Sequence, residues 1–109
     1  MLEDRRLGHR SETRESIRFE LRGALRFGTM RNLSQLGCML ESPALDVEVG
    51  ERCEVRLMAG YVVSGRVAWQ LGDAIGISFH LPIPSSLVRD FALDDWSLRA
   101  ANGQAGGRY

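Results

Sequence analysis

Residues 17–22 read IRFELR, and in this stretch Ile17, Phe19 and Leu21 alternate with charged side chains. Alternation with a period of two is the pattern of a β-strand that buries one face. Similar segments return along the chain, separated by turn residues about every eight to twelve positions. Further strands are expected at 24–31, 38–41, 53–58, 61–69 and 74–79. The sequence therefore predicts an all-β fold, either a small antiparallel barrel or a sandwich.

The chain has 109 residues, a length suited to one domain. Residues 1–15 are polar and Arg-rich and show no sustained period, so we expect a flexible N-terminal arm. Residues 16–99 are expected to form the barrel and a C-terminal helix that contains Leu87 and Val88. The glycine-containing tail, residues 100–109, is expected to be disordered.

The charge is uneven although the formal net charge is zero. All 14 cationic residues are arginine, which excludes phosphate-loop and Schiff-base chemistries that require lysine. Residues 1–31 hold eight arginines and five acids, a net of +3, and residues 32–109 hold six arginines and nine acids, a net of −3. A basic segment on a neutral protein favours a local anionic ligand, with a solvated charged arm as the alternative.

Residue types that support catalysis are sparse. His9 and His80 have no Cys or carboxylate at metal-ligand spacing, and the chain has no Gly-x-Ser-x-Gly motif to hold a nucleophile. The carboxylates are scattered over expected strand faces and turns. We therefore expect a binding module without a metal or cofactor rather than an enzyme.

Cys38 and Cys53 both lie in apolar runs, and the chain contains no CxxC motif. The sequence shows no signal peptide and no apolar run near the ~18 residues that a membrane span needs. These features predict two reduced core thiols and a cytoplasmic protein without a membrane span.

Six arginines, at positions 6, 10, 14, 18, 22 and 26, recur every four residues. On a helix this spacing would form a basic stripe suited to RNA or a membrane surface. An even spacing also keeps Arg18 and Arg22 on the outer face of a strand, and the alternation in residues 17–22 fits only the strand. A small RNA-binding barrel is therefore the less favoured alternative.

Three features follow one another along the chain: Arg10-x-x-x-Arg14, then Asn32-x-Ser34-x-x-Gly37, then Val67-x-Trp69 followed by GISF at 76–79. Together they resemble the PilZ family, small bacterial β-barrel receptors for the second messenger cyclic di-GMP. The resemblance covers about residues 5–98. It implies a six-stranded antiparallel barrel with a short C-terminal helix.

The resemblance also implies roles for individual residues. Arg10 and Arg14 would clamp the ligand, Asn32 and Ser34 would hydrogen-bond guanine, and Gly37 would let the turn approach the ligand. Guanidinium groups suit this ligand, since they bind phosphate oxygens and the guanine O6/N7 edge bidentately.

Other residues bear on how the ligand is held. Arg5 and Arg6 are additional candidates that bear on whether one or two ligand molecules bind. Trp69 is assigned to the core. Asn32, Ser34 and Gly37 have an alternative interpretation as a simple side-chain-stabilised turn between strands.

The function implied is a cyclic di-GMP receptor or adaptor. Binding would order the N-terminal arm against the barrel and change a surface that a partner protein reads. The main alternative is a PilZ-like adaptor that binds proteins without binding the nucleotide.

Overall fold

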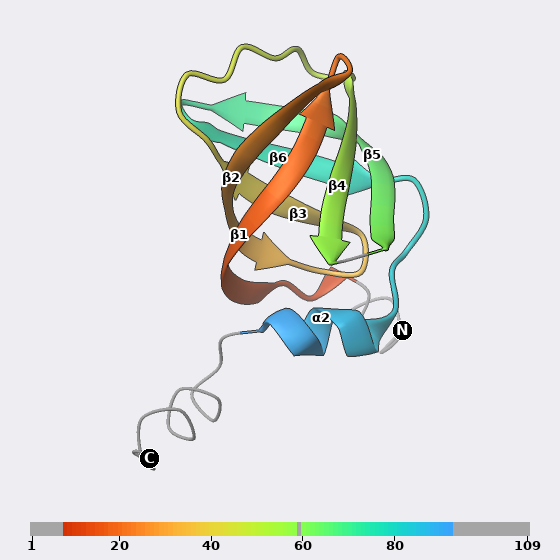
Figure 1. The fold of residues 1–109 in the computed structure, drawn as a ribbon. Helices are drawn as coiled ribbons and strands as arrows, with labels where there is room; N and C mark the ends of the chain where they lie inside the picture. Colours follow the sequence, from red (N-terminus) through yellow and green to blue (C-terminus); the bar gives the residue numbers. More distant parts are fainter. Residues whose placement is uncertain (1–7, 59, 93–109) are drawn as a thin grey trace.

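The structure, a computed structural model, describes residues 8–58 and 60–92. Within these residues six antiparallel strands close into a barrel in the order β1-β2-β3-β6-β5-β4 (Figure 1). A short helix follows the last strand. The elements are β1 (Ser11–Leu21), β2 (Ala24–Leu33), β3 (Gly37–Glu41), β4 (Arg52–Met58), β5 (Tyr61–Leu71), β6 (Ala74–Phe79) and α2 (Ser85–Phe91). The prediction of a six-stranded barrel with a short C-terminal helix is confirmed.

The barrel interior is filled by apolar side chains that every strand contributes. Among them Phe19, Met30, Leu40, Val55 and Ile75 are fully buried. Burial of one such side chain contributes roughly 1.5–3 kcal/mol, so the alternating pattern of the strands supplies most of the drive for closure.

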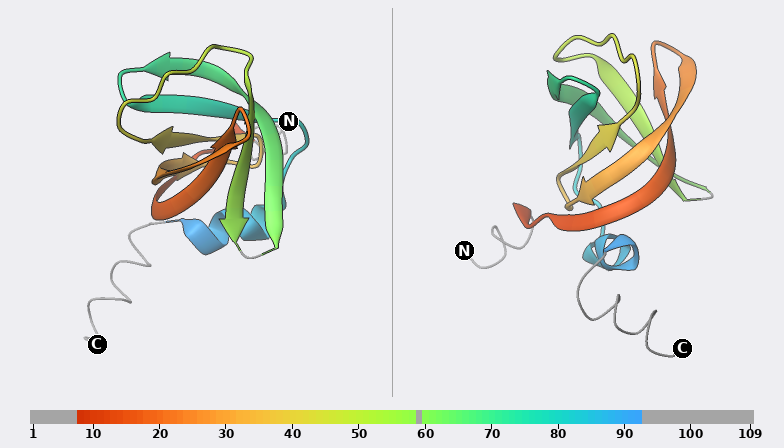
Figure 2. Two further views of the ribbon diagram at one scale, coloured as in Figure 1. Left: turned by 45° about the horizontal axis from the view of Figure 1, so that its top comes forward. Right: turned by 90° about the vertical axis from the view of Figure 1, so that its left-hand side faces the viewer.

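Helix α2 covers one open end of the barrel, as the views of Figures 1 and 2 agree. Its buried residues Leu87 and Val88 join the core cluster, together with Ile83 from the segment between β6 and α2. The helix therefore serves as a plug whose position depends on that segment.

β1 begins earlier than the sequence suggests. Residues 11–15, assigned to the arm, belong to the strand and pair with the end of β2. Thr13 is buried, and its Oγ1 donates a hydrogen bond to the backbone oxygen of Met30 at 2.7 Å. A bulge between Glu12 and Glu15 breaks the alternation here, which hides this part of the strand from a periodicity argument. The boundary at residue 15 was wrong.

Both cysteines are free and buried within the barrel. Burial raises the pKa of the Cys53 thiol to about 12 and raises the pKa of the Cys38 thiol even further from its ordinary value. In residues 8–58 and 60–92, helices are too short to cross a bilayer. The same ranges hold no group of three or more His, Cys, Asp or Glu residues placed to bind a metal ion.

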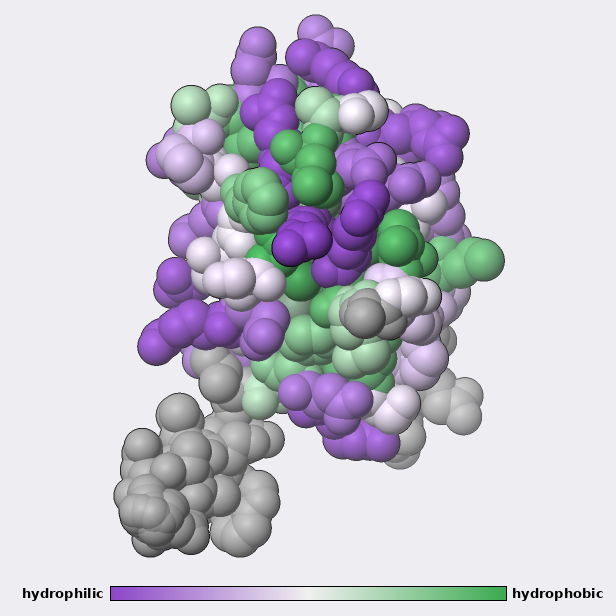
Figure 3. Space-filling model, in the orientation of Figure 1, coloured by the Kyte–Doolittle hydropathy of each residue, from purple (hydrophilic) through white to green (hydrophobic). Residues whose placement is uncertain are grey.

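The surface mixes charged and apolar side chains. Figure 3 shows one face of the barrel, where hydrophobic residues emerge in separate patches among hydrophilic ones. Exposed apolar residues of the described chain include Phe27, Val62, Leu71 and Leu81. Scattered exposed residues of this kind are normal, so exposure alone does not identify a binding surface.

Candidate functional site

The two polar motifs meet where the start of β1 lies beside the end of β2, at the opposite end of the strand pair from their connecting turn. Arg10, just before β1, donates a hydrogen bond from Nη1 to Oδ1 of Asn32 at 2.8 Å. Glu12 is the direct cross-strand partner of Asn32, so Arg10 and Arg14 lie two residues to either side of the position opposite this amide. A contact across 22 sequence positions thus places the arginine pair beside the second motif.

Arg14 lies in the β1 bulge, and its side chain is exposed. Bulges change the direction of a side chain relative to the regular strand, and they are common beside binding sites. Arg31, on the strand opposite this bulge, is also exposed and forms an ion pair with Glu41 at 3.4 Å. Arg10 and Arg14 therefore present two exposed guanidinium groups next to Asn32.

Ser34 and Gly37 build the turn between β2 and β3. The Ser34 hydroxyl accepts hydrogen bonds from the backbone N–H groups of Leu36 at 3.1 Å and Gly37 at 3.2 Å. The Ser34 N–H donates to the Gly37 oxygen at 2.8 Å. With 1% of its surface exposed, Ser34 directs its hydroxyl to the turn itself in this structure.

Gly37 allows β3 to approach β6 closely. A Cβ at this position would overlap the backbone oxygen of Ile77. The glycine is thus required by packing between two strands, a constraint independent of any ligand. The interpretation of this motif as a self-stabilised turn accounts for Ser34 and Gly37, and it leaves Asn32 as the motif side chain that faces outward.

Gln35, within the same turn, was not singled out by the sequence. Its Nε2 donates to the backbone oxygen of Ile83 at 2.7 Å, and the N–H of Ile83 donates back to the oxygen of Gln35 at 2.9 Å. This reciprocal pair attaches the turn to the segment that leads into α2. Gln35 occupies a position of the motif where the residue type is not specified, so the motif does not indicate this long-range contact.

Trp69 lies on the surface and is 40% exposed, so its assignment to the core was wrong. A bulge between Val67 and Trp69 reverses the face of β5, leaving Val67 inside and Trp69 outside. The indole ring lies against Gly76, where a Cβ would collide with it.

The strand register extends this surface to the motif. Asn32 pairs with Met39, Met39 with Gly76, and Gly76 with Trp69. Adjacent strands are about 4.8 Å apart, so this cross-strand row spans about 14 Å between the backbones of Asn32 and Trp69. Because the Trp69 indole lies over Gly76, the ring is nearer to Asn32 than the Trp69 backbone is. An exposed aromatic ring and a half-buried amide therefore share one outer face of the barrel.

Of the residues that the sequence nominated, the structure brings together Arg10, Arg14, Asn32, Ser34 and Gly37. Arg5 and Arg6 lie outside the described residues, as does the tail 100–109. A small cavity of about 120 Å³ adjoins the site, lined in part by His9, Gln35 and Arg89. It is too small for a whole dinucleotide, since ligand pockets usually occupy about 300–1,000 Å³.

The profile of the PilZ domain family matches residues 4–92. The chain therefore belongs to the PilZ domain family. Comparison with curated proteins finds no significant match.

Among solved structures, the chain is similar to the PlzA protein of Borreliella burgdorferi, crystallised in complex with c-di-GMP. The sequences are 16% identical, the TM-score is 0.61, and the match covers 84% of this chain and 42% of PlzA. The chain thus spans less than half the length of that protein. At this identity the similarity establishes a shared fold.

Proposed function

We propose that this protein is a receptor for cyclic di-GMP, bound by Arg10, Arg14 and Asn32 beside the turn that Ser34 and Gly37 shape. The observation that carries the proposal is the 2.8 Å hydrogen bond from Arg10 to Asn32, which joins the two motif segments on one surface. Membership of the PilZ domain family and the fold shared with PlzA, whose structure contains c-di-GMP, support it.

The exposed groups suit the chemistry of this ligand. Its two phosphodiesters are anionic, and guanidinium groups bind phosphate oxygens through paired, charge-assisted hydrogen bonds. The Nδ2 group of Asn32 carries two N–H donors that match the O6 and N7 acceptors of guanine. Trp69 offers an aromatic surface for a base on the same face.

Binding would change the N-terminal segment more than the barrel. Arg10 would exchange its neutral partner, Asn32, for a ligand phosphate, because an anionic acceptor adds charge–charge attraction to the hydrogen bond. Arg5 and Arg6 precede this segment in the sequence and would be drawn toward the same anion. The rearranged segment would form a surface that a partner protein reads. The protein would thus act by binding rather than by catalysis. Its proposed location is the cytoplasm.

Isothermal titration calorimetry tests this proposal. Wild-type protein should bind cyclic di-GMP and neither GTP nor cyclic GMP. Arg10→Ala and Arg14→Ala should each weaken binding at least tenfold, or by about 1.4 kcal/mol, because each removes a charge-assisted contact. Arg52→Ala is the matched control, since Arg52 is an exposed arginine on β4.

Two results would contradict the proposal: no heat from the wild-type protein, or wild-type affinity in both the Arg10→Ala and Arg14→Ala variants. The first result would favour a PilZ adaptor that binds proteins alone. One observation favours that second function: Asn32 and Ser34 already have internal hydrogen-bond partners. An adaptor of this kind would give a stable complex with a partner protein without the nucleotide.

A further inference from the structure

One edge of β5 is open along its first residues. Residues 61–64 pair with β4, whereas the ladder between β5 and β6 begins at Gly65 and Phe79. The last hydrogen bond on the β6 side runs from the N–H of His80 to the oxygen of Ser64, at 2.9 Å. Alternate residues of an antiparallel strand direct both backbone groups to the same side. The N–H and C=O of Val62 therefore point past the end of β6.

The sequence explains why β6 stops here. Continued pairing in the same register would place Pro82 opposite Val62. Proline has no N–H and cannot donate to a ladder, so it ends a paired strand. The chain instead turns away through Leu81 and Pro82 toward α2. The open edge is thus encoded in the sequence.

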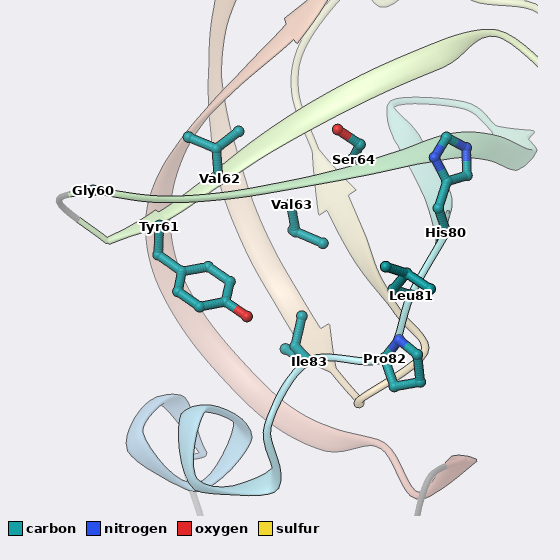
Figure 4. A pocket seen from close by; sticks show the side chains of 9 residues that line it. All are labelled: Gly60, Tyr61, Val62, Val63, Ser64, His80, Leu81, Pro82 and Ile83. Atoms are coloured by element: carbon teal, nitrogen blue, oxygen red, sulfur yellow. The ribbon is translucent and has the colours of Figure 1, made fainter.

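A groove of about 540 Å³ occupies the space between this edge and the segment that turns away (Figure 4). Tyr61, Val63 and Ile83 point into the groove, and Val62 projects from the opposite side of β5 (Figure 4). Val62 is 50% exposed, and Leu81, across the groove, is 75% exposed. Among the described residues that line the groove, none carries a carboxylate or a guanidinium group. It combines the backbone groups of Val62, which β6 leaves unpaired, with a lining of apolar side chains together with Ser64 and His80.

We propose that this groove is a docking site for an extended, apolar segment of a partner protein, which adds as a short strand to the open edge of β5. The backbone groups of Val62 can pair with the backbone of an extended segment, whereas a helix uses its own backbone groups internally. Side chains of the added strand would pack against the accessible apolar residues Tyr61, Val62 and Leu81, because Val63 and Ile83 are almost fully buried in the core. Apolar side chains suit these contacts.

Two copies of this chain fit the groove less well. If two β5 edges paired about a two-fold axis, the ladder would be centred on Val62. It would include only Tyr61–Val63, because Ser64 is already bonded to His80. A partner segment that runs through the groove would contact the Leu81–Ile83 wall as well.

The groove is connected to the candidate nucleotide site through one residue. Ile83 forms its wall, and both backbone groups of Ile83 are hydrogen-bonded to Gln35 of the motif turn. A ligand that moves the turn would therefore move this wall. This coupling rests on the proposed function, whereas the docking site itself does not.

Display of a random heptapeptide library on phage, followed by synthesis of the selected peptides, tests the docking site without the nucleotide. Selected peptides should be apolar at alternate positions. Leu81→Asp should weaken their binding at least tenfold. Leu71→Asp should leave it unchanged, since Leu71 is equally exposed at the far end of β5. N-methylation should abolish binding at the peptide amide that donates to the Val62 oxygen and not at the amides directly before and after it, which point away from β5.

The proposal is overturned if no peptide with these properties is selected, if Leu71→Asp and Leu81→Asp act alike, or if N-methylation has no alternating effect. It is also overturned if the protein dimerises and Leu81→Asp prevents the dimer, because the groove is then an interface between two copies. In a further titration, cyclic di-GMP should change peptide affinity at least threefold in wild-type protein and by a smaller factor in Gln35→Ala, which loses the side-chain bond to Ile83 and keeps the backbone one. Absence of nucleotide binding by the wild-type protein would remove the coupling and the proposed function and leave the docking site in place.

Discussion

The turn at 34–37 and the arginine segment at 10–14 are two unlike halves of the candidate site. In the turn, the Ser34 hydroxyl and backbone are bonded internally, and Gly37 is buried against β6. In the arginine segment the guanidinium groups are exposed, and Arg10 makes a single hydrogen bond across to Asn32. The turn is fixed by its own hydrogen bonds, and the arginine segment carries exposed charged side chains. The difference predicts that changes to the turn alter stability, whereas changes to the arginine segment alter ligand affinity.

The largest effect on stability is expected from Gly37→Ala. The added Cβ would overlap the oxygen of Ile77, so β3 and β6 must separate. We expect the free energy of unfolding to fall by about 2–3 kcal/mol, as is typical of overpacking in a rigid interior. Urea denaturation measures this loss. Gly8→Ala is the control, because a Cβ there meets nothing within 4 Å. Equal stability of the two variants would contradict the account of the turn.

A smaller loss is expected from Ser34→Ala. The substitution leaves the N–H groups of Leu36 and Gly37 without their acceptor, which should lower the free energy of unfolding by about 1–2 kcal/mol. Ser16→Ala, an exposed change on β1, should have an effect below about 0.5 kcal/mol. If Ser34→Ala leaves stability unchanged and weakens only cyclic di-GMP binding, the hydroxyl serves the ligand and the division into two halves is wrong.

The smallest expected effect belongs to the exposed half. Glu12 is exposed and directly opposite Asn32, so its carboxylate repels an anionic ligand. Glu12→Gln should raise the affinity for cyclic di-GMP about two- to threefold at low salt, since a surface charge interaction contributes up to about 1 kcal/mol. Glu48→Gln, on the β3–β4 loop, should leave the affinity unchanged. Reduced affinity in Glu12→Gln would place the phosphates away from this strand.

Periodicity predicted most of the fold because most strands alternate regularly, as Ile17, Phe19 and Leu21 do. It failed at bulges, where one extra residue reverses the faces of a strand. The β1 bulge hid the start of that strand at Ser11, and the β5 bulge turned Trp69 from an expected core residue into a surface residue. A bulge depends on cross-strand register, which a single sequence does not display.

The sequence motifs nominated the residues of the candidate site but gave only part of the contacts among them. The motif spacing identified Arg10 and Asn32, and the structure joins them. The same spacing did not reveal that the Ser34 hydroxyl serves its own turn, because a motif records residue types and not the partners of their atoms. The contact of Gln35 with Ile83 spans 48 positions and lay beyond any local pattern.

The central claim is that the arginine segment and Asn32, beside the turn, bind cyclic di-GMP together. Backbone amide chemical shifts of the ¹⁵N-labelled protein, followed by NMR during titration with the nucleotide, test it most directly. We predict that the largest shifts fall on residues 9–14 and 32–37, with little change along β4 at Arg52–Met58. Saturation of the protein with shifts confined to β4, or with Arg10 and Asn32 unmoved, would contradict the claim.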